Sequence, residues 1–231
     1  MNNAIDPIKI LVCGGYEVGK TSLVRRLADM QFPRDYTQTT GINHVEFVCM
    51  LKNNASVKIN LIDVGADLIH SQIDSSFFPV LLMDADAVLI VFDSTSLQSL
   101  KESDEWLDFL SRSIVKPTFK YLLVHKADLP SENRVISALN LDRFVKNMHI
   151  DGWCYSVGHP DLSDCCVNSN RGSLSQQRAP EDILKKLVLK VLTSRQSNIY
   201  KVLPVPLVVD FKSWATYDYE DLEKYINAYV M

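Results

Sequence analysis

The chain has 231 residues, of which 47% are hydrophobic and 23% are charged, and this composition is typical of a folded globular protein. A formal net charge of −4 argues against a nucleic-acid partner, and no apolar run is long enough to predict a membrane-spanning helix. The first residues lack the basic segment of a signal peptide, and the five cysteines predict neither a zinc site nor a disulfide scaffold. We therefore expect a cytoplasmic protein.

Apolar runs alternate with helix-like segments along most of the chain. Strands are predicted over residues 8–13, 44–51, 56–62, 86–92, 121–124 and 153–155, and helices over 20–30, 97–110, 139–148 and 182–192. In the first helix, Leu23, Leu27 and Met30 are expected on one face. The strands on either side of Asn53-Asn54 show apolar alternation, which predicts a hairpin. The fold class that follows is α/β, with a doubly wound, mostly parallel six-stranded sheet and one antiparallel edge strand.

The last part of the chain differs in composition from the rest. We expect one domain over residues 1–198, with a polar loop at 158–180, followed by an extension over 199–231. The extension holds seven of the 21 aromatic residues, and its final residues have the spacing of a short amphipathic helix. We expect it to pack on its own domain, and the alternative is a helix that binds a partner.

A glycine-rich loop is the first motif that carries chemistry. Residues 14–21, GGYEVGKT, match G-x-x-x-x-G-K-[ST] and stand between a predicted strand and a predicted helix. Backbone N–H groups of such a loop bind phosphate oxygens, Lys20 would reach the terminal phosphates, and the Thr21 hydroxyl would bind Mg²⁺. The alternative is a glycine-rich turn with a solvated lysine. The nucleotide-binding residues predicted here are Gly14, Gly15, Tyr16, Glu17, Val18, Gly19, Lys20, Thr21 and Ser22.

With this loop and the motifs that follow it, the sequence resembles the Ras-like small GTPases, and within them the Rab and Rab-like branch, over about residues 8–195. Residues 36–41, YTQTTG, are similar to the first switch of a Rab protein, in which Thr39 would bind Mg²⁺ and the terminal phosphate. Asp63 is similar to the second metal-side aspartate, which acts through water. The resemblance thus implies the P-loop, small-GTPase topology and a Mg²⁺ site formed by Thr21, Thr39 and Asp63.

A second group of motifs resembles the guanine site of that family. Residues 125–128, HKAD, stand where the family has Asn-Lys-x-Asp, so Asp128 would recognise the guanine ring and Lys126 would cover the base. Ser156 and Val157 resemble the start of the motif that brings a backbone N–H to the guanine oxygen. The implied cofactors are GTP or GDP with Mg²⁺. Four motif clusters follow predicted strands, and parallel sheets bind ligands at the carboxyl ends of their strands. These clusters are at Gly14, Asp63, 125–128 and Ser156.

The second switch departs from the family pattern. It reads Asp-Val-Gly-Ala-Asp over 63–67, where the family has Asp-x-x-Gly followed by Gln. Ala66 replaces the glycine that meets the terminal phosphate, and Asp67 replaces the glutamine that orients the attacking water. The Tyr16 ring would obstruct an arginine finger. No catalytic residue is predicted, and we expect slow or absent hydrolysis unless another side chain, such as Gln72, takes over the role; whether the chain is an enzyme stays open.

The guanine motifs are altered as well. His125 replaces an asparagine that ties the base loop to the phosphate loop, and Val157-Gly158 replaces Ala-Lys. A histidine forms fewer of the required hydrogen bonds, and each lost bond costs about 0.5–1.5 kcal/mol. We expect guanine recognition through Asp128 with reduced affinity.

Two functions remain open at this stage. The first is a guanine-nucleotide switch of the Rab-like type in intracellular transport, and the second is a non-enzymatic scaffold on the same fold. The last cysteine is Cys166, so we expect no prenyl anchor, a feature shared with Rab-like proteins of ciliary transport complexes. The expected partners are protein effectors or a transport-complex subunit, with the chain as a monomer or in a hetero-oligomer, in the cytoplasm or the cilium. An adenylate-using enzyme is less favoured because of Asp128 and the hairpin.

Overall fold

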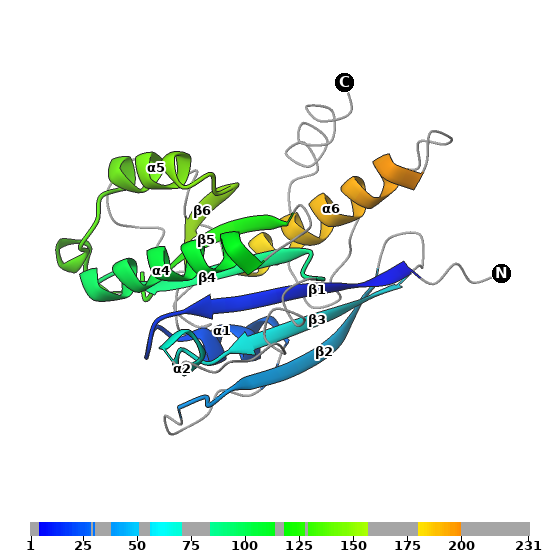
Figure 1. Cartoon of the computed structure of the whole chain (residues 1–231), viewed down its shortest axis with the longest axis horizontal. Coiled ribbons are helices and arrows are strands. Elements are labelled where there is room, and N and C mark those ends of the chain that lie inside the picture. The colour runs from blue at the N-terminus through cyan, green and yellow to red at the C-terminus, as the bar shows by residue number, and fades with distance from the viewer. Residues whose placement is uncertain are drawn as a thin grey trace.

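A mixed sheet with strand order β2-β3-β1-β4-β5-β6 forms the centre of the computed structural model of the chain (Figure 1). The structure describes residues 5–28, 30, 38–50, 56–70, 84–113, 118–127, 129–156 and 180–199. Five strands are parallel within this part of the chain: β1 (Ile5–Gly14), β3 (Ser56–Val64), β4 (Ala87–Asp93), β5 (Phe119–His125) and β6 (Gly152–Tyr155). The edge strand β2 (Ile42–Met50) is antiparallel to β3. The predicted fold class is confirmed.

The burial of each strand explains its sequence pattern. The central strands β1 and β4 are buried on both faces, so residues 10–13 and 87–92 form nearly continuous apolar runs. Strand β2 lies at the edge, where Cys49 is buried while Val48 beside it is exposed. This difference matches the alternation that predicted the hairpin.

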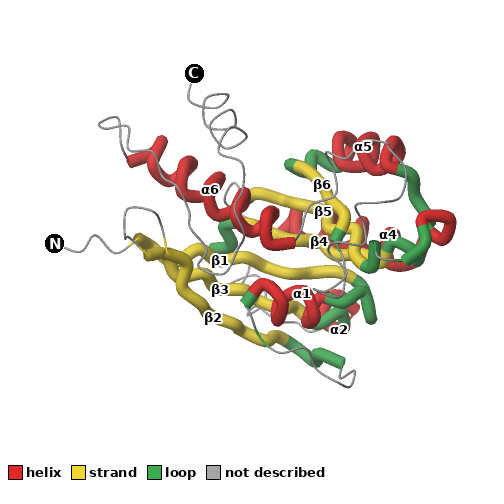
Figure 2. Tube along the Cα trace, turned by 180° about the vertical axis from the view of Figure 1, so that it is seen from behind, coloured by secondary structure: helices red, strands yellow, loops and turns green. Residues whose placement is uncertain are grey.

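Helices cover both faces of the sheet. Helices α1 (Lys20–Leu27) and α6 (Pro180–Ile199) pack on one face, where Leu23 and Leu187 belong to a single apolar cluster (Figure 2). Helices α4 (Leu97–Ser113) and α5 (Ala138–Asn147) pack on the other face through residues such as Trp106 and Leu141 (Figure 1). The short helices α2 (Asp67–His70) and η1 (Ser131–Asn133) lie in loops. No helix in the described part of the chain has the length and apolar character needed to cross a membrane.

Several predicted boundaries shift in the structure. Helix α1 ends at Leu27 instead of continuing to residue 30, because the chain turns there and the Met30 N–H bonds to the Arg25 carbonyl. The prediction that Met30 shares a helix face with Leu23 and Leu27 is therefore wrong, because Met30 lies beyond the helix and is 45% exposed while the two leucines are buried. Helices α2 and η1 were not predicted, because three or four residues are too few to show a periodic pattern. Residues 158–179 and 200–231, which include most of the predicted polar loop and the C-terminal extension, lie outside the described residues.

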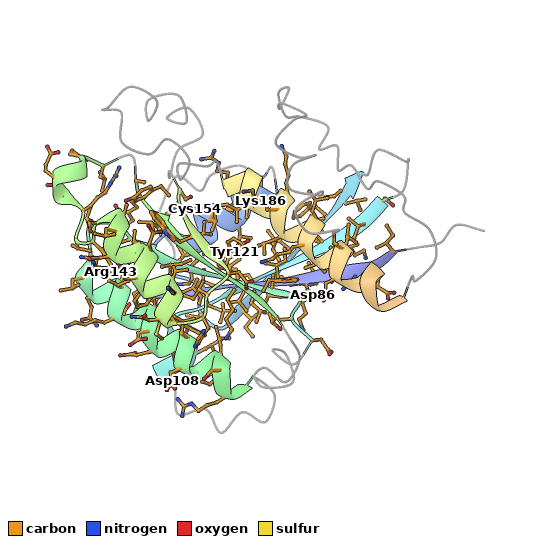
Figure 3. All side chains as sticks on the ribbon, turned by 90° about the horizontal axis from the view of Figure 1, so that it is seen from above. Asp86, Asp108, Tyr121, Arg143, Cys154 and Lys186 are labelled. Carbon is orange, nitrogen blue, oxygen red and sulfur yellow. The ribbon has the colours of Figure 1, made fainter. Side chains whose placement is uncertain are left out.

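The two ends of the sheet have different chemistry. At the amino ends of the strands, Arg195 of α6 donates hydrogen bonds to the carbonyls of Asp6 and Pro7 and to the Asp86 carboxylate, at 2.6 to 2.9 Å. Asp86 also accepts a bond from the Lys9 backbone N–H at 2.9 Å, and it lies beside α6 in Figure 3. This end joins the last described helix to the first strand. The carboxyl ends, on the left in Figure 1, carry the predicted site residues.

Candidate nucleotide-binding site

The glycine-rich loop follows β1 and opens α1, as the sequence predicts. Gly14 and Gly19 have φ angles of 146° and 96°, which glycine adopts readily. A Cβ atom on Gly14 would lie 2.1 Å from the Val91 carbonyl oxygen, and one on Gly19 would lie 2.5 Å from the His125 ring. Both glycines are thus required by the close approach of other strands. The glycine-rich loop packs against β4 and β5, and these contacts fix the loop backbone that a ligand would bind.

Lys20 lies inside this loop with its side chain buried. Its Nζ donates to the carbonyl oxygens of Gly14 and Gly15, at 3.0 and 2.6 Å. Burial lowers the pKa of Lys20, and the negative charge of Asp63 opposes that shift. The carbonyl bonds hold the Lys20 ammonium within the loop, the position from which such a lysine can bind phosphate oxygens.

Three side chains from different elements meet beside Lys20. The Thr21 hydroxyl, on the first turn of α1, donates to Asp63 Oδ2 at 2.6 Å and lies 2.7 Å from the Thr39 hydroxyl. Asp63 stands near the end of β3, and Thr39 precedes β2. The predicted Mg²⁺ ligands are therefore close together in space, although 42 residues separate Thr21 from Asp63.

The environment of Asp63 suits a cation. Its side chain is 1% exposed, and Oδ1 is buried without a hydrogen-bond partner among the described residues. Burial raises the pKa of Asp63, although hydrogen bonds from Thr21 and Thr39 and the charge of Lys20 lower it. Mg²⁺ prefers such hard oxygen ligands together with water. The donor set fits the Mg²⁺ that the resemblance implies, with the unpaired carboxylate oxygen as the group that a cation or its water would satisfy.

His125 lies where the resemblance places the guanine site. This residue is buried, its Nδ1 lies 3.0 Å from Ser156 Oγ, and its ring packs against Gly19. His125 thus links the base loop to the phosphate loop by packing, where the family uses an asparagine. The Ser156 N–H donates to the Val124 carbonyl within the sheet. The backbone N–H of Ser156 is therefore already used within the fold.

Lys126 has a partner that sequence reasoning did not identify. Its Nζ forms an ion pair with Asp93 Oδ2 at 2.7 Å, and its backbone has a φ of 55°. Burial raises the pKa of Asp93, but the hydrogen bonds from Lys126 and Thr95 outweigh it, so the pKa of Asp93 is lowered. Asp93 ends β4, at the same edge as the predicted motifs, and this position is the signal that could have identified it. The predicted residues Asp128 and Val157 lie outside the described residues.

The second switch contacts the first one directly. The Gly65 N–H donates to the Gly41 carbonyl at 2.7 Å, and the Gly41 N–H donates to Asp67 Oδ2 at 3.3 Å. Ala66 between them is buried. Asp67 therefore faces the first switch, a contact that its sequence position alone does not reveal.

Two further positions of the glycine-rich loop, Tyr16 and Gly15, differ in their surroundings. Tyr16 is 41% exposed, so the ring that we predict would obstruct an arginine finger stands at the surface of the loop. The Glu102 carboxylate of α4 occupies the space that a side chain on Gly15 would need. The sequence did not point to Glu102, since it lies on a helix face with no motif.

Fold and loop together define a P-loop protein with the sheet order of a small GTPase. A family model described as the Ras family matches residues 9–154, and the chain belongs to that family. It is 29% identical to "Ras-related protein Rab-7L1" of Rattus norvegicus over 149 residues, which are 63% of this chain and 70% of the relative.

Two further relatives extend the comparison. "Ras-related protein Rab-28" of Caenorhabditis elegans is 30% identical over 133 residues, 56% of this chain and 52% of that protein. "Intraflagellar transport protein 22 homolog" of Xenopus tropicalis is 33% identical over 122 residues, 51% of this chain and 64% of that protein. The predicted membership of the Rab-like branch of small GTPases is thus confirmed.

Proposed function

We propose that this protein is a guanine-nucleotide-binding regulator that binds GTP or GDP together with Mg²⁺. The observation that carries the proposal is the meeting of Thr21, Thr39 and Asp63 beside Lys20. Bound Mg²⁺ would neutralise phosphate charge. Lys20 and the backbone of the loop would bind the phosphates, while Thr21 and Thr39, with Asp63 through water, would bind the metal.

The base would be bound at the other end of the site. In this proposal Asp128 recognises the guanine ring, and Lys126 covers it once the nucleotide is bound. The ion pair with Asp93 keeps Lys126 at this edge of the sheet. His125 and Ser156 hold the base loop against the phosphate loop.

The pathway is proposed from the relatives. Two of them are named as Rab proteins and one as an intraflagellar transport protein, which supports a role in intracellular or ciliary transport and a protein effector or transport-complex subunit as the partner. The location proposed with this role is the cytoplasm or the cilium. Residues 1–198 would form the nucleotide-binding domain, and residues 199–231 would pack on it or contact the partner.

Nucleotide content tests the proposal most directly. Freshly purified protein is denatured, and the released nucleotide is separated by chromatography. We expect guanine nucleotide at a molar ratio near one, and calorimetry at millimolar Mg²⁺ should show rebinding. An empty site with no binding of GDP or GTP would contradict the proposal.

A scaffold function is the second candidate, and one observation favours it. The Lys20 ammonium is already bonded to the carbonyls of Gly14 and Gly15, so the loop satisfies its own cation. A protein of this kind would bind its partner equally well with and without nucleotide. The same purification separates the two functions, because a scaffold that needs no nucleotide would be isolated empty and would still bind its partner.

Hydrolysis is expected to be slow for three structural reasons. Ala66 is buried where the family has glycine, the Asp67 carboxylate faces Gly41, and Tyr16 stands at the loop surface. An arginine finger accelerates hydrolysis by about 10³–10⁵ when it can enter, and we expect no such gain here. Single-turnover phosphate release is the measurement, with Asp67→Gln as a variant that should help little. A wild-type rate equal to that of ordinary Rab proteins would contradict this prediction.

A further inference from the structure

The Asp67 carboxylate lies between the two switch segments. Its Oδ2 accepts the Gly41 N–H at 3.3 Å, just beside the bond from the Gly65 N–H to the Gly41 carbonyl. A Cβ on Gly65 would lie 2.3 Å from Asp67 Oδ1 and 2.7 Å from the Thr39 carbonyl oxygen. The carboxylate therefore packs over Gly65 and closes the space between the segments around residues 39–41 and 65–67.

The second oxygen of this carboxylate is buried. Asp67 Oδ1 has no hydrogen-bond partner among the described residues, although it is enclosed by the backbone around it. The negative charge also acts on the Lys20 ammonium, the group that would bind the terminal phosphates. Asp67 thus places an anionic group on the phosphate side of the site, in contact with the first switch.

Resting on the proposed function, we propose that Asp67 joins the two switch segments in place of a terminal phosphate and makes the site selective for a nucleoside diphosphate. In the family pattern, the residues at positions 39 and 66 meet the terminal phosphate. Here the carboxylate already accepts the N–H of Gly41 in the first switch and is held over Gly65 in the second. A third phosphate would have to displace this anionic acceptor or lie beside it, and both outcomes are unfavourable.

This arrangement makes the shape of the switch region independent of the nucleotide. The bonds between Gly65, Gly41 and Asp67 involve only the chain itself. A partner that recognises the joined switches would find them in the diphosphate form. Nucleotide would then stabilise the fold and hold the metal, while Asp67 would set the conformation.

Nucleotide selectivity provides the first test. Dissociation constants for GDP and for a non-hydrolysable GTP analogue are measured with Mg²⁺ on the full chain, for the wild type and for Asp67→Asn. The asparagine keeps the size and one acceptor oxygen but removes the charge. We expect the wild type to prefer GDP by about tenfold or more, the factor that one charged hydrogen bond supplies. Asp67→Asn should reduce the ratio to about threefold or less, mainly through tighter triphosphate binding.

Asp104→Asn is the matched control, because Asp104 is an exposed aspartate on α4. Its ratio should equal that of the wild type. A wild-type chain that binds both nucleotides equally, or an unchanged ratio in Asp67→Asn, would overturn the selectivity proposed for Asp67. Failure to bind either nucleotide would instead contradict the proposed function.

Amide hydrogen exchange tests the contact without reference to nucleotide affinity. Residue-resolved exchange at Gly41 is compared for the wild type, Asp67→Ala and Asp104→Ala, as purified and after nucleotide removal. We expect the protection of Gly41 to fall about tenfold in Asp67→Ala alone, since its acceptor is removed. Equal protection in all three proteins would overturn the proposal, including in a protein that binds no nucleotide.

Discussion

Asp63 and Asp86 lie at opposite ends of the sheet, and their carboxylates differ in how completely they are hydrogen-bonded. At the amino end, the Asp86 carboxylate accepts bonds from Arg195 and from the backbone of Lys9. At the carboxyl end, Asp63 is buried with one oxygen unpaired. A buried carboxylate oxygen without a hydrogen bond opposes folding, whereas a fully paired carboxylate supports it. The comparison indicates that the carboxyl end keeps a buried carboxylate oxygen that the described part of the fold leaves without a hydrogen bond.

At the carboxyl end of the sheet, the largest effect is expected from removal of the Lys20 ammonium group. Lys20→Ala deletes the only basic group of the loop, so guanine-nucleotide binding should fall at least about a hundredfold, the combined effect of two charged hydrogen bonds. Calorimetry at millimolar Mg²⁺ is the measurement. Lys101→Ala on the exposed side of α4 serves as the control and should bind normally. Near-normal binding by Lys20→Ala would place the phosphates elsewhere.

A pair of matched substitutions compares the two ends directly. Asp86→Asn should lower the free energy of unfolding by about 1.5–3 kcal/mol, because Arg195 loses its anionic partner. Asp63→Asn in the nucleotide-free protein should leave that free energy unchanged or raise it by about 1 kcal/mol, since the buried charge is removed. Urea denaturation measures both effects. Equal destabilisation by the two substitutions would contradict the distinction between the ends.

Base specificity tests whether the carboxyl end of the sheet recognises guanine. Asp128→Asn should weaken GTP binding and favour xanthosine triphosphate, because the side chain proposed to accept hydrogen bonds from the guanine ring becomes a donor. Each unpaired polar group costs about 1–3 kcal/mol, so the preference should shift roughly tenfold or more. Competition binding with both nucleotides is the measurement. An unchanged preference for GTP would place base recognition outside residues 125–128.

The last expected effect is confined to alkaline pH and lies in the edge hairpin, near the amino end of β3. Burial raises the pKa of Cys49 from 9.0 to about 12, so the unfolded chain loses this proton first as the pH rises. The free energy of unfolding should therefore fall between pH 9 and pH 12, with Cys49 contributing about 1.4 kcal/mol per pH unit. Denaturation of Cys49→Ala across this range should show a shallower pH slope than the wild type.

Val57→Ala provides the control for that slope. Val57 is the partner of Cys49 in the strand register and is fully buried, but it carries no titratable group. This variant should be less stable at every pH and should keep the wild-type slope. Parallel curves for the wild type and Cys49→Ala would show that the thiol does not contribute to alkaline unfolding.

The sequence predicts the elements of the fold because their patterns are local. The apolar run of β4 and the alternation in the β2–β3 hairpin depend on neighbouring residues, and so does the loop that places Lys20. Thr39 and Asp63 could be placed near Thr21 because their segments resemble family motifs, and Asp63 also follows a predicted strand. The family model confirms the topology that these patterns imply.

Contacts between distant segments were not predictable. The orientation of Asp67 depends on a backbone N–H that is 26 residues away, and the partner of Lys126 is 33 residues away. Sequence spacing contains no information on which rotamer a side chain adopts toward a distant group. Side chains whose partners lie far along the chain are therefore those for which the structure adds most.

The bonds from Arg195 to the carbonyls of Asp6 and Pro7 join the first strand to the last described helix, so this strand is synthesised long before its partner. Translation proceeds at about 5–20 residues per second, so roughly 10 to 40 seconds pass between synthesis of the first strand and of its partner in the last described helix. During that interval the sheet face that α6 covers lacks Leu187 and Val188. Transiently exposed apolar surface of this kind is prone to aggregation, and slower translation before residue 180 would lengthen its exposure.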